Sequence, residues 1–147
     1  MTSSHPATWE AKQLLTECDS KRQRRSGPGG QHRNKVETAV ILTHRPSQIQ
    51  GQASERRSQQ ENRRVALFRL RLNLALEIRS DSQPPLPSEL WQQRCTAKRI
   101  SIRATHEDFP ALLAEVLDLC QATGGELKTV AQQLETTASQ LIRFLKM

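Results

Sequence analysis

The stretch SQQENRRVALFRLRLNLALEIR, residues 58–79, decides the fold because it holds the clearest periodic pattern in the chain. Ser58 with Glu61 three residues later is a capping-box pattern, which is typical of the first turn of a helix. Apolar side chains then recur at helical spacing, and this face holds Leu67, Phe68, Leu70, Leu72, Leu74, Ala75 and Ile78. The pattern predicts one long helix whose apolar face packs on a sheet.

The residues before this helix predict that sheet. KVETAVILTH, residues 35–44, places Val36, Thr38, Val40 and Leu42 on one side and Glu37, Ala39 and Ile41 on the other, which indicates a half-buried strand. RPSQ, residues 45–48, supplies a turn, and IQGQA, residues 49–53, a second strand, so the two form a hairpin. Residues 7–19 predict a short helix or a helix that leads into a strand.

A second module follows a break. SDSQPPLPSE, residues 80–89, contains three prolines and predicts a linker, and residues 89–103 form a basic segment whose helical part the pattern does not delimit. Asp108 or Thr105 can cap a helix through residues 111–123, which Gly124 and Gly125 end. A second helix over residues 126–135 and a third from Thr137 complete the module.

The predicted fold is therefore α+β: a small, mostly antiparallel sheet packed by one long helix, plus a C-terminal three-helix module. We expect residues 1–80 to form one domain, residues 81–106 a Pro-rich linker and basic segment, and residues 107–147 the small helical module.

Charge is distributed unevenly along the 147 residues. Residues 1–106 hold 19 Lys and Arg against 9 Asp and Glu, a net +10, whereas residues 107–147 hold 3 against 6, a net −3. A polyanion such as RNA or DNA would therefore meet the first part. No apolar run approaches the roughly 20 residues that span a bilayer, so the sequence predicts no membrane partner.

Cysteines and the N-terminus point to a cytoplasmic protein. Cys18, Cys95 and Cys120 are odd in number and lack metal-ligand spacing, which predicts reduced structural thiols and no metal or other cofactor. The first residues have no apolar signal core, and Glu10, Glu17 and Asp19 argue against an organellar transit peptide.

The segment RRSGPGGQHRNK, residues 24–35, sets three glycines among basic residues. Glycines at positions 27, 29 and 30 permit positive φ and close approach of the backbone, so residues 29–31 can present bare N–H groups to a ligand. A flexible basic turn is the alternative. A Walker-type phosphate loop is excluded because no Gly-Lys-Ser/Thr follows.

This segment resembles the catalytic domain of the class I peptide chain release factors. The resemblance extends from about residue 14 to 79, in RSGPGGQHRNKVETAVILTHRPS followed by IQGQASERRSQQENRRVALFRLRLNL. It includes Gly-Gly-Gln, an Asn three residues later, a Val-rich strand, a His-x-Pro turn, Arg-Ser-Gln and an Asn-Arg helix start. Ser47-Gln48-Ile49 departs from it, since the family usually has Thr-Gly-Ile there, and this puts the hairpin geometry in doubt.

The resemblance implies hydrolysis of the ester that joins a nascent peptide to tRNA, in the peptidyl-transferase centre of the large ribosomal subunit. Within the loop at residues 26–35, Gly29 and Gly30 would hold the backbone conformation. The Gln31 backbone N–H would stabilise developing charge, and its side chain would admit water and exclude larger nucleophiles. Candidates for contacts with rRNA and peptidyl-tRNA are Arg24, Arg25, His32, Arg33, Asn34, Lys35, Arg57, Ser58 and Gln59.

Stop-codon reading in that family needs a separate decoding domain, for which this sequence has no room. Pro6-Ala7-Thr8 spells a tripeptide of the recognition type but lies too close to Gly29 to reach the decoding centre. We therefore expect a codon-independent hydrolase that rescues stalled ribosomes. The family's stand-alone members usually carry a basic C-terminal tail. Here residues 107–147 are net acidic, so recognition of the stalled ribosome would use a protein partner, contacted through residues 107–147, or the basic segment 94–103. Alternatively, the substrate is peptidyl-tRNA on a split large subunit.

Two other classes remain open. One is a ribosome- or RNA-binding factor without hydrolysis, which the intact Gly29-Gly30-Gln31 disfavours. The other is a DNA-binding protein that uses a helix-turn-helix in residues 126–146, which the net negative charge of that module disfavours.

Overall fold

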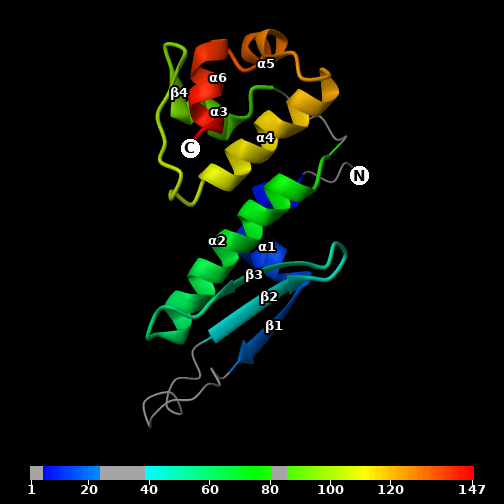
Figure 1. Ribbon diagram of the computed structural model, residues 1–147, viewed down its shortest axis with the longest axis vertical. Coiled ribbons are helices and arrows are strands. Elements are labelled where there is room, and N and C mark those ends of the chain that lie inside the picture. The colour runs from blue at the N-terminus through cyan, green and yellow to red at the C-terminus, as the bar shows by residue number, and fades with distance from the viewer. Residues whose placement is uncertain (1–4, 24–38, 81–85) are drawn as a thin grey trace. The chain divides into compact units, whose positions relative to one another are not determined.

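The computed structural model describes residues 5–23, 39–80 and 86–147, and the chain divides into two compact units. The N-terminal unit is Trp9–Leu74. The C-terminal unit consists of two segments of the sequence, Ala75–Met147 and the described part of the first eight residues. Together they give the mixed α+β fold, with a three-stranded antiparallel sheet, one long helix packed on it, and C-terminal helices (Figure 1). The predicted fold class is confirmed.

The N-terminal unit is a sheet with neighbouring strands adjacent in sequence. Its elements are α1 (Ala11–Thr16), β1 (Cys18–Gln23), β2 (Ala39–His44), β3 (Ile49–Ala53) and α2 (Gln59–Glu77), the last of which runs on into the C-terminal unit. The strand order is β1-β2-β3, with both pairs antiparallel. The lead-in at residues 7–19 is thus a helix followed by the first strand, which the sequence pattern did not delimit.

Alternation along β2 explains which face of the sheet is covered. Val40, Leu42 and His44 are buried, and the residues between them are only half-buried, as the predicted strand requires. In α2 the fully buried positions begin earlier than the apolar pattern indicated and follow one stripe, which consists of Asn62, Ala66, Leu70, Leu74 and Ala75. Leu67 and Phe68 lie at its margins, half-buried.

The turn between β2 and β3 keeps its geometry without a glycine. Gln48, which stands where the related family usually has glycine, adopts a φ of 62°. Its backbone N–H donates to the His44 carbonyl at 2.7 Å, and its side-chain Nε2 donates to the Arg45 carbonyl at 2.8 Å. The hairpin forms because these two bonds hold a non-glycine residue in the left-handed region.

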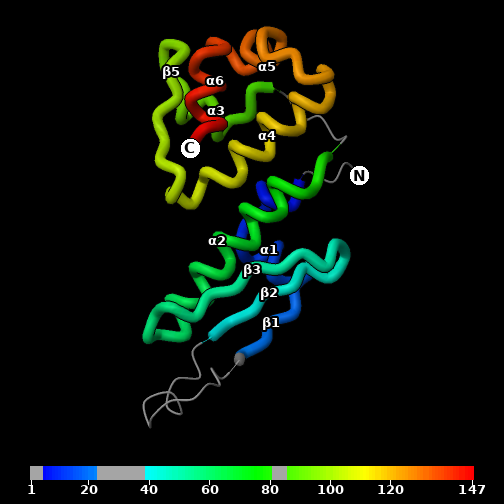
Figure 2. Tube along the Cα trace, in the orientation of Figure 1, coloured from blue at the N-terminus to red at the C-terminus, as the bar shows by residue number. Residues whose placement is uncertain are grey.

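The C-terminal unit contains more structure than the three predicted helices. Those helices are present as α4 (Phe109–Ala122), α5 (Leu127–Gln133) and α6 (Ala138–Leu145). Gly124 and Gly125 follow α4 with φ of 68° and 88°, as predicted, and α6 begins after Thr137, whose hydroxyl accepts the Gln140 backbone N–H. Asp108 is the residue before α4, but its side chain makes no capping hydrogen bond. The segment 89–103 adds α3 (Glu89–Arg94) and a hairpin of β4 (Cys95–Thr96) and β5 (Arg99–Ile100), traced in Figure 2.

Aromatic rings form the centre of this unit. Trp91 is almost fully buried, its ring meets Phe144 edge to face at 5.9 Å, and Phe109 stacks on Phe144 at 5.0 Å. The Trp91 indole N–H donates to the Leu134 carbonyl at 2.8 Å. In the described part of the chain, no helix is both long and apolar enough to cross a membrane.

The Pro6-Ala7-Thr8 tripeptide is part of this core. These residues form the 3-10 turn η1 (Pro6–Thr8), which packs against α4, and Ala7 is fully buried. His5, also buried, accepts the Ala7 backbone N–H at Nδ1 and contacts the Ile78 carbonyl through Nε2 at 2.9 Å. The tripeptide thus has a structural role.

Candidate nucleic-acid interface

The strand residues that flank the predicted catalytic segment lie at one end of the sheet. Gln23 at the end of β1 pairs with Ala39 at the start of β2, and the adjacent Val40 pairs with Ala53 at the end of β3. Gln23 and Ala39, which flank residues 24–38 in the sequence, therefore form one strand pair at this end of the sheet (Figure 1). Of the predicted site, the residues that lie outside the described ones are Arg24, Arg25, Gly29, Gly30, Gln31, His32, Arg33, Asn34 and Lys35.

The other three candidates, Arg57, Ser58 and Gln59, lie where α2 begins. Arg57 and Ser58 are exposed, and Gln59 is half-buried as the first residue of the helix. The Ser58 hydroxyl accepts the Glu61 backbone N–H at 3.3 Å, which confirms the predicted cap. The strand pairing brings Ala53, four residues before Arg57, to the sheet end that holds Gln23 and Ala39.

Asn62 positions this segment, and sequence reasoning missed its role. Its side chain is fully buried; Oδ1 accepts the Arg56 backbone N–H at 2.9 Å, and Nδ2 donates to the Arg56 carbonyl at 3.0 Å. One amide therefore satisfies both backbone groups of the residue that precedes Arg57. The sequence feature that could have indicated this role is the presence of an Asn on the helix face that otherwise carries apolar residues.

Gly51 sets the distance between β3 and α2. A Cβ at this position would lie 2.3 Å from the Ala66 carbonyl oxygen and 2.3 Å from the Leu70 backbone nitrogen. The helix backbone can approach the strand this closely only because Gly51 has no side chain and Ala66 a small one. In the sequence, the glycine within the strand IQGQA was the feature that could have predicted this close approach of the helix.

Arg69 ties α2 to the end of β3. Its Nη1 donates to the Gln52 carbonyl at 2.9 Å and to Glu55 Oε1 at 3.1 Å, and its Nη2 donates to Glu55 Oε2. The Arg69 hydrogen bonds, together with backbone N–H donors, lower the pKa of Glu55 to about 2. The pair fixes the start of the segment that contains Arg57.

The opposite end of the hairpin is held by a polar cluster. His44 Nε2 lies 2.9 Å from Glu17 Oε1, and His44 Nδ1 lies 2.7 Å from the Ser47 hydroxyl. Arg45 donates to the Thr16 carbonyl at 2.6 Å and to Asp19 Oδ1 at 3.0 Å. The His-x-Pro turn thus anchors α1 and β1 to the hairpin.

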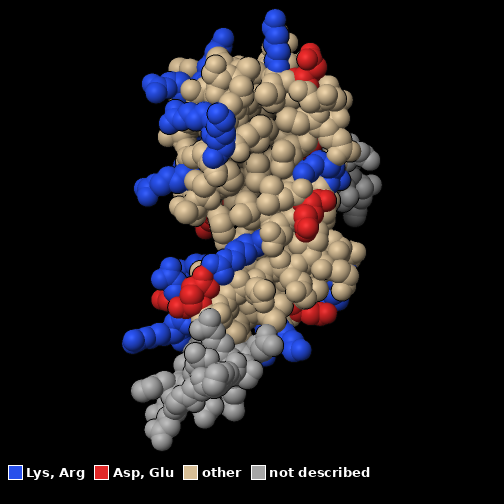
Figure 3. Space-filling model, in the orientation of Figure 1, with Lys and Arg blue, Asp and Glu red and all other residues tan. Residues whose placement is uncertain are grey.

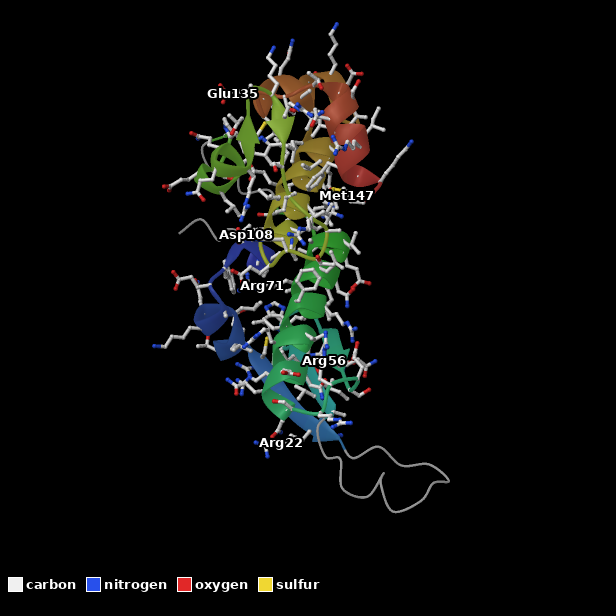
Figure 4. All side chains as sticks on the ribbon, turned by 90° about the vertical axis from the view of Figure 1, so that its left-hand side faces the viewer. Arg22, Arg56, Arg71, Asp108, Glu135 and Met147 are labelled. Atoms are coloured by element: carbon white, nitrogen blue, oxygen red, sulfur yellow. The ribbon has the colours of Figure 1, made fainter. Side chains whose placement is uncertain are left out.

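Exposed basic side chains outnumber the exposed acidic side chains, Glu55 and Glu61, at the sheet end that holds Gln23 and Ala39. Six basic side chains are exposed: Lys21, Arg22, Arg56, Arg57, Arg63 and Arg64. They come from β1, the segment before α2, and the first turns of α2; Figure 4 labels Arg22 and Arg56, and Figure 3 colours the basic and acidic side chains. Such a surface suits phosphate groups.

Within the described ranges, no group of three or more His, Cys, Asp or Glu is arranged to hold a metal ion.

The three cysteines are free, half-buried thiols. Burial raises the pKa of Cys18, Cys95 and Cys120 above the ordinary value of a thiol. At neutral pH they are therefore protonated and weak nucleophiles, which fits a packing role.

Comparison with known proteins agrees with this geometry. The model of the RF-1 domain family matches residues 14–108. Peptide chain release factor 1 of Dictyoglomus thermophilum is 40% identical over 87 residues, which cover 59% of this chain and 23% of that protein. Peptide chain release factor 2 of Acidovorax sp. strain JS42 is 55% identical over 51 residues, or 35% of this chain and 14% of that protein. The matched part of this chain thus covers less than a quarter of the length of each of these relatives.

Proposed function

Because the chain belongs to the RF-1 domain family, we propose that it hydrolyses the ester bond of peptidyl-tRNA on the ribosome without reading a stop codon. The observation that carries the proposal is the joint presence of Gly29-Gly30-Gln31 and of a sheet end where Gln23 pairs with Ala39. The pairing of Gln23 with Ala39 brings together the two residues that flank 24–38, and the exposed basic side chains at this end of the sheet favour an RNA environment.

In the proposed mechanism the loop backbone acts on the ester. Gly29 and Gly30 allow the backbone to approach the reacting carbonyl closely. The Gln31 backbone N–H donates to the oxygen on which negative charge develops, and its side chain admits water while excluding larger nucleophiles. Water is the nucleophile: its oxygen bonds to the carbonyl carbon, the bond to the tRNA ribose oxygen breaks, and that oxygen takes a proton.

The basic residues hold the domain on its RNA partners. We propose that Arg24, Arg25, His32, Arg33, Asn34 and Lys35 contact rRNA or peptidyl-tRNA. Arg57, Ser58 and Gln59 support these contacts from the start of α2. Asn62 acts through the backbone of Arg56 and is a positioning residue for Arg57.

The location of Pro6-Ala7-Thr8 argues against a codon-reading role for this tripeptide, as the proposed codon independence requires. The central alanine of this tripeptide is buried in η1 against α4, and a buried residue does not read a codon. We further propose that residues 1–80 carry the catalysis, that residues 81–106 link them to the module at 107–147, and that this module contacts a protein partner. The proposed substrate places the protein in the cytoplasm.

The test is release of labelled peptide from ribosomes stalled without a stop codon. The natural protein should release peptide, and Gly30→Ala should reduce the rate by about 100-fold or more, as expected when an oxyanion donor is misplaced. Gln31→Ala keeps the backbone N–H and should instead let nucleophiles larger than water attack the ester. Gln121→Ala, at an exposed position of α4, is the matched control and should keep the natural rate. Equal rates for the natural protein and the Gly30 variant would refute hydrolysis by this loop.

Binding measurements separate the two competing functions. If the natural protein binds ribosomes but releases no peptide, a non-hydrolytic binding factor is favoured. If it prefers duplex DNA to ribosomal subunits across a range of salt concentrations, the helix-turn-helix function of residues 126–146 is favoured.

A further inference from the structure

A hollow of about 580 Å³ lies in the C-terminal unit. Its wall is formed by the hairpin of β4 and β5, by the residues that follow it, and by α6. Four arginines line it, namely Arg94, Arg99, Arg103 and Arg143, together with His106. The proposed function uses none of these residues.

Hydrogen bonds fix the two walls of the hollow to each other. Gln140 Oε1 accepts the Ile100 backbone N–H at 3.1 Å, which docks α6 on β5. Arg143 follows Gln140 by three residues and therefore shares its face of the helix. The Thr136 hydroxyl donates to the Lys98 carbonyl at 2.7 Å and so holds the hairpin turn.

The turn that carries Arg99 is conformationally strained. Ala97 and Lys98 both have positive φ, at 51° and 67°, although neither is a glycine or an asparagine. Such turns are favourable for a tight hairpin but are disfavoured for these residue types. The structure thus holds Arg99 beside the hollow at some conformational cost, with the bonds from Thr136 and Gln140 as the restraint.

Three of the four arginines are available to a ligand. Arg94 donates to Asp108 Oδ2 at 3.0 Å, so its charge is already partly balanced. Arg99, Arg103 and Arg143 are exposed, and no acidic side chain in the described part of the chain forms an ion pair with them. Figure 3 shows Lys and Arg side chains gathered on the side of this unit that carries β4 and α6, and Figure 4 turns this side toward the viewer and labels Asp108.

The lining indicates which part of a ligand is bound. Guanidinium groups match phosphate oxygens in charge and in the spacing of their donors. The residues that line the hollow include no Phe, Tyr or Trp on which a base could stack. Several guanidinium groups around one open hollow suit successive phosphates better than a single small anion.

We propose that this hollow binds the phosphate backbone of RNA, as a second contact separate from residues 24–35. The inference rests on the proposed function, because ribosomal RNA is the ligand that a protein acting on the ribosome would meet. It also explains the charge distribution: residues 107–147 are net acidic, yet their Arg143 joins Arg99 and Arg103 from the basic segment. The net negative charge of residues 107–147 therefore does not exclude a basic surface around the hollow.

The test is fluorescence anisotropy of a short labelled RNA stem-loop, titrated with the full chain at several salt concentrations. The variant is Arg99→Gln/Arg103→Gln/Arg143→Gln. The matched control is Lys12→Gln/Lys128→Gln/Lys146→Gln, which removes the same charge at exposed positions outside the lining. Circular dichroism melting establishes that both variants are folded.

The arginine variant should bind the RNA at least about tenfold more weakly, and its salt dependence should lose about two to three phosphate contacts, whereas the control changes little. Equal loss in both variants would overturn the proposal, since net charge alone would then explain binding. A second outcome would also overturn the proposal: inorganic phosphate binds the natural protein and not the arginine variant, yet it does not displace the RNA. The hollow would then be a site for a small anion, and RNA would be the wrong ligand. Since the assay contains no peptidyl-tRNA, failure of peptide release leaves its result intact.

Discussion

Large aromatic side chains fill the C-terminal unit, whereas the N-terminal unit joins its sheet and helix through a glycine and through polar side chains bonded to the backbone. In the former, Trp91 and Phe144 pack in the centre, next to Phe109. In the latter, Gly51 admits the helix backbone and Asn62 holds the chain at Arg56. The contrast implies that substitutions act differently in the two units.

In the C-terminal unit a substitution should mainly change stability, because apolar packing is distributed over several rings. In the N-terminal unit a substitution at a backbone contact should also move the segment that carries Arg57 and Ser58. The predictions below test this difference, beginning with the largest effect.

Trp91→Ala should have the largest effect on the C-terminal unit. It removes a nearly fully buried ring and a hydrogen bond, which typically costs about 3–5 kcal/mol in the free energy of unfolding. Trp91→Phe keeps the contact with Phe144 but leaves the Leu134 carbonyl without its donor, which costs about 1–3 kcal/mol. Urea denaturation gives both values. Hydrogen exchange should show the loss of protection in residues 75–147, and an equal loss in Trp9–Leu74 would contradict the contrast.

Gly51→Ala should destabilise the N-terminal unit by about 3 kcal/mol, the upper end for overpacking. The new Cβ meets backbone atoms of α2 at 2.3 Å, which rotation of a side chain cannot relieve. Gln52→Ala, at the next and exposed position of β3, is the control and should change the free energy of unfolding little. A Gly51→Ala protein as stable as the natural one would mean that α2 and β3 are not in close contact.

Asn62→Ala should cost about 1–3 kcal/mol, because the backbone N–H and carbonyl of Arg56 lose their partners. The positioning role predicts a further effect: weaker ribosome binding at unchanged temperature and salt, even where the variant is fully folded. Gln60→Ala, at an exposed position of the same helix, is the control. A folded Asn62→Ala protein with natural ribosome affinity would reduce Asn62 to a stability role.

The elements that the sequence predicted are those with a strong local signal. The alternation through Val40 and Leu42 gave β2, the pattern from Ser58 gave α2, and the two glycines gave the end of α4. The hairpin of β4 and β5 was not predicted because each strand has two residues and its turn holds Ala97 and Lys98. Neither periodicity nor turn chemistry can reveal such an element.

The site was predictable only where a motif carried it. Arg57, Ser58 and Gln59 lie at the predicted start of α2, and their contacts with RNA stay a prediction. The role of Asn62 could not be predicted because it depends on a contact with a residue outside its own helix. Likewise, the basic hollow joins Arg143 to residues about 40 positions earlier, and only tertiary packing brings them together.

Gln48→Gly should stabilise the hairpin by about 0.5–1 kcal/mol, because glycine adopts positive φ without the steric cost of a Cβ. The gain is limited because the bond from Nε2 to the Arg45 carbonyl is lost. Gln48→Ala separates the two terms: it loses that bond and keeps the Cβ, so it should be less stable than the natural protein. If alanine and glycine give the same melting temperature, the turn is not strained.

The smallest effect should come from the exposed pair of Glu55 and Arg69, and its sign depends on pH. Because hydrogen bonds from Arg69 lower the pKa of Glu55 from 4.5 to about 2 in the folded chain, the carboxylate stabilises the fold above pH 4.5. This contribution is lost as the pH falls from 4.5 toward 2. The melting temperature of the natural protein should therefore exceed that of Glu55→Gln at neutral pH, and the gap should close on acidification and shrink in high salt. A gap that is independent of pH would show that Glu55 acts through its shape or its neutral hydrogen bonds, and that the N-terminal unit owes no stability to this charge.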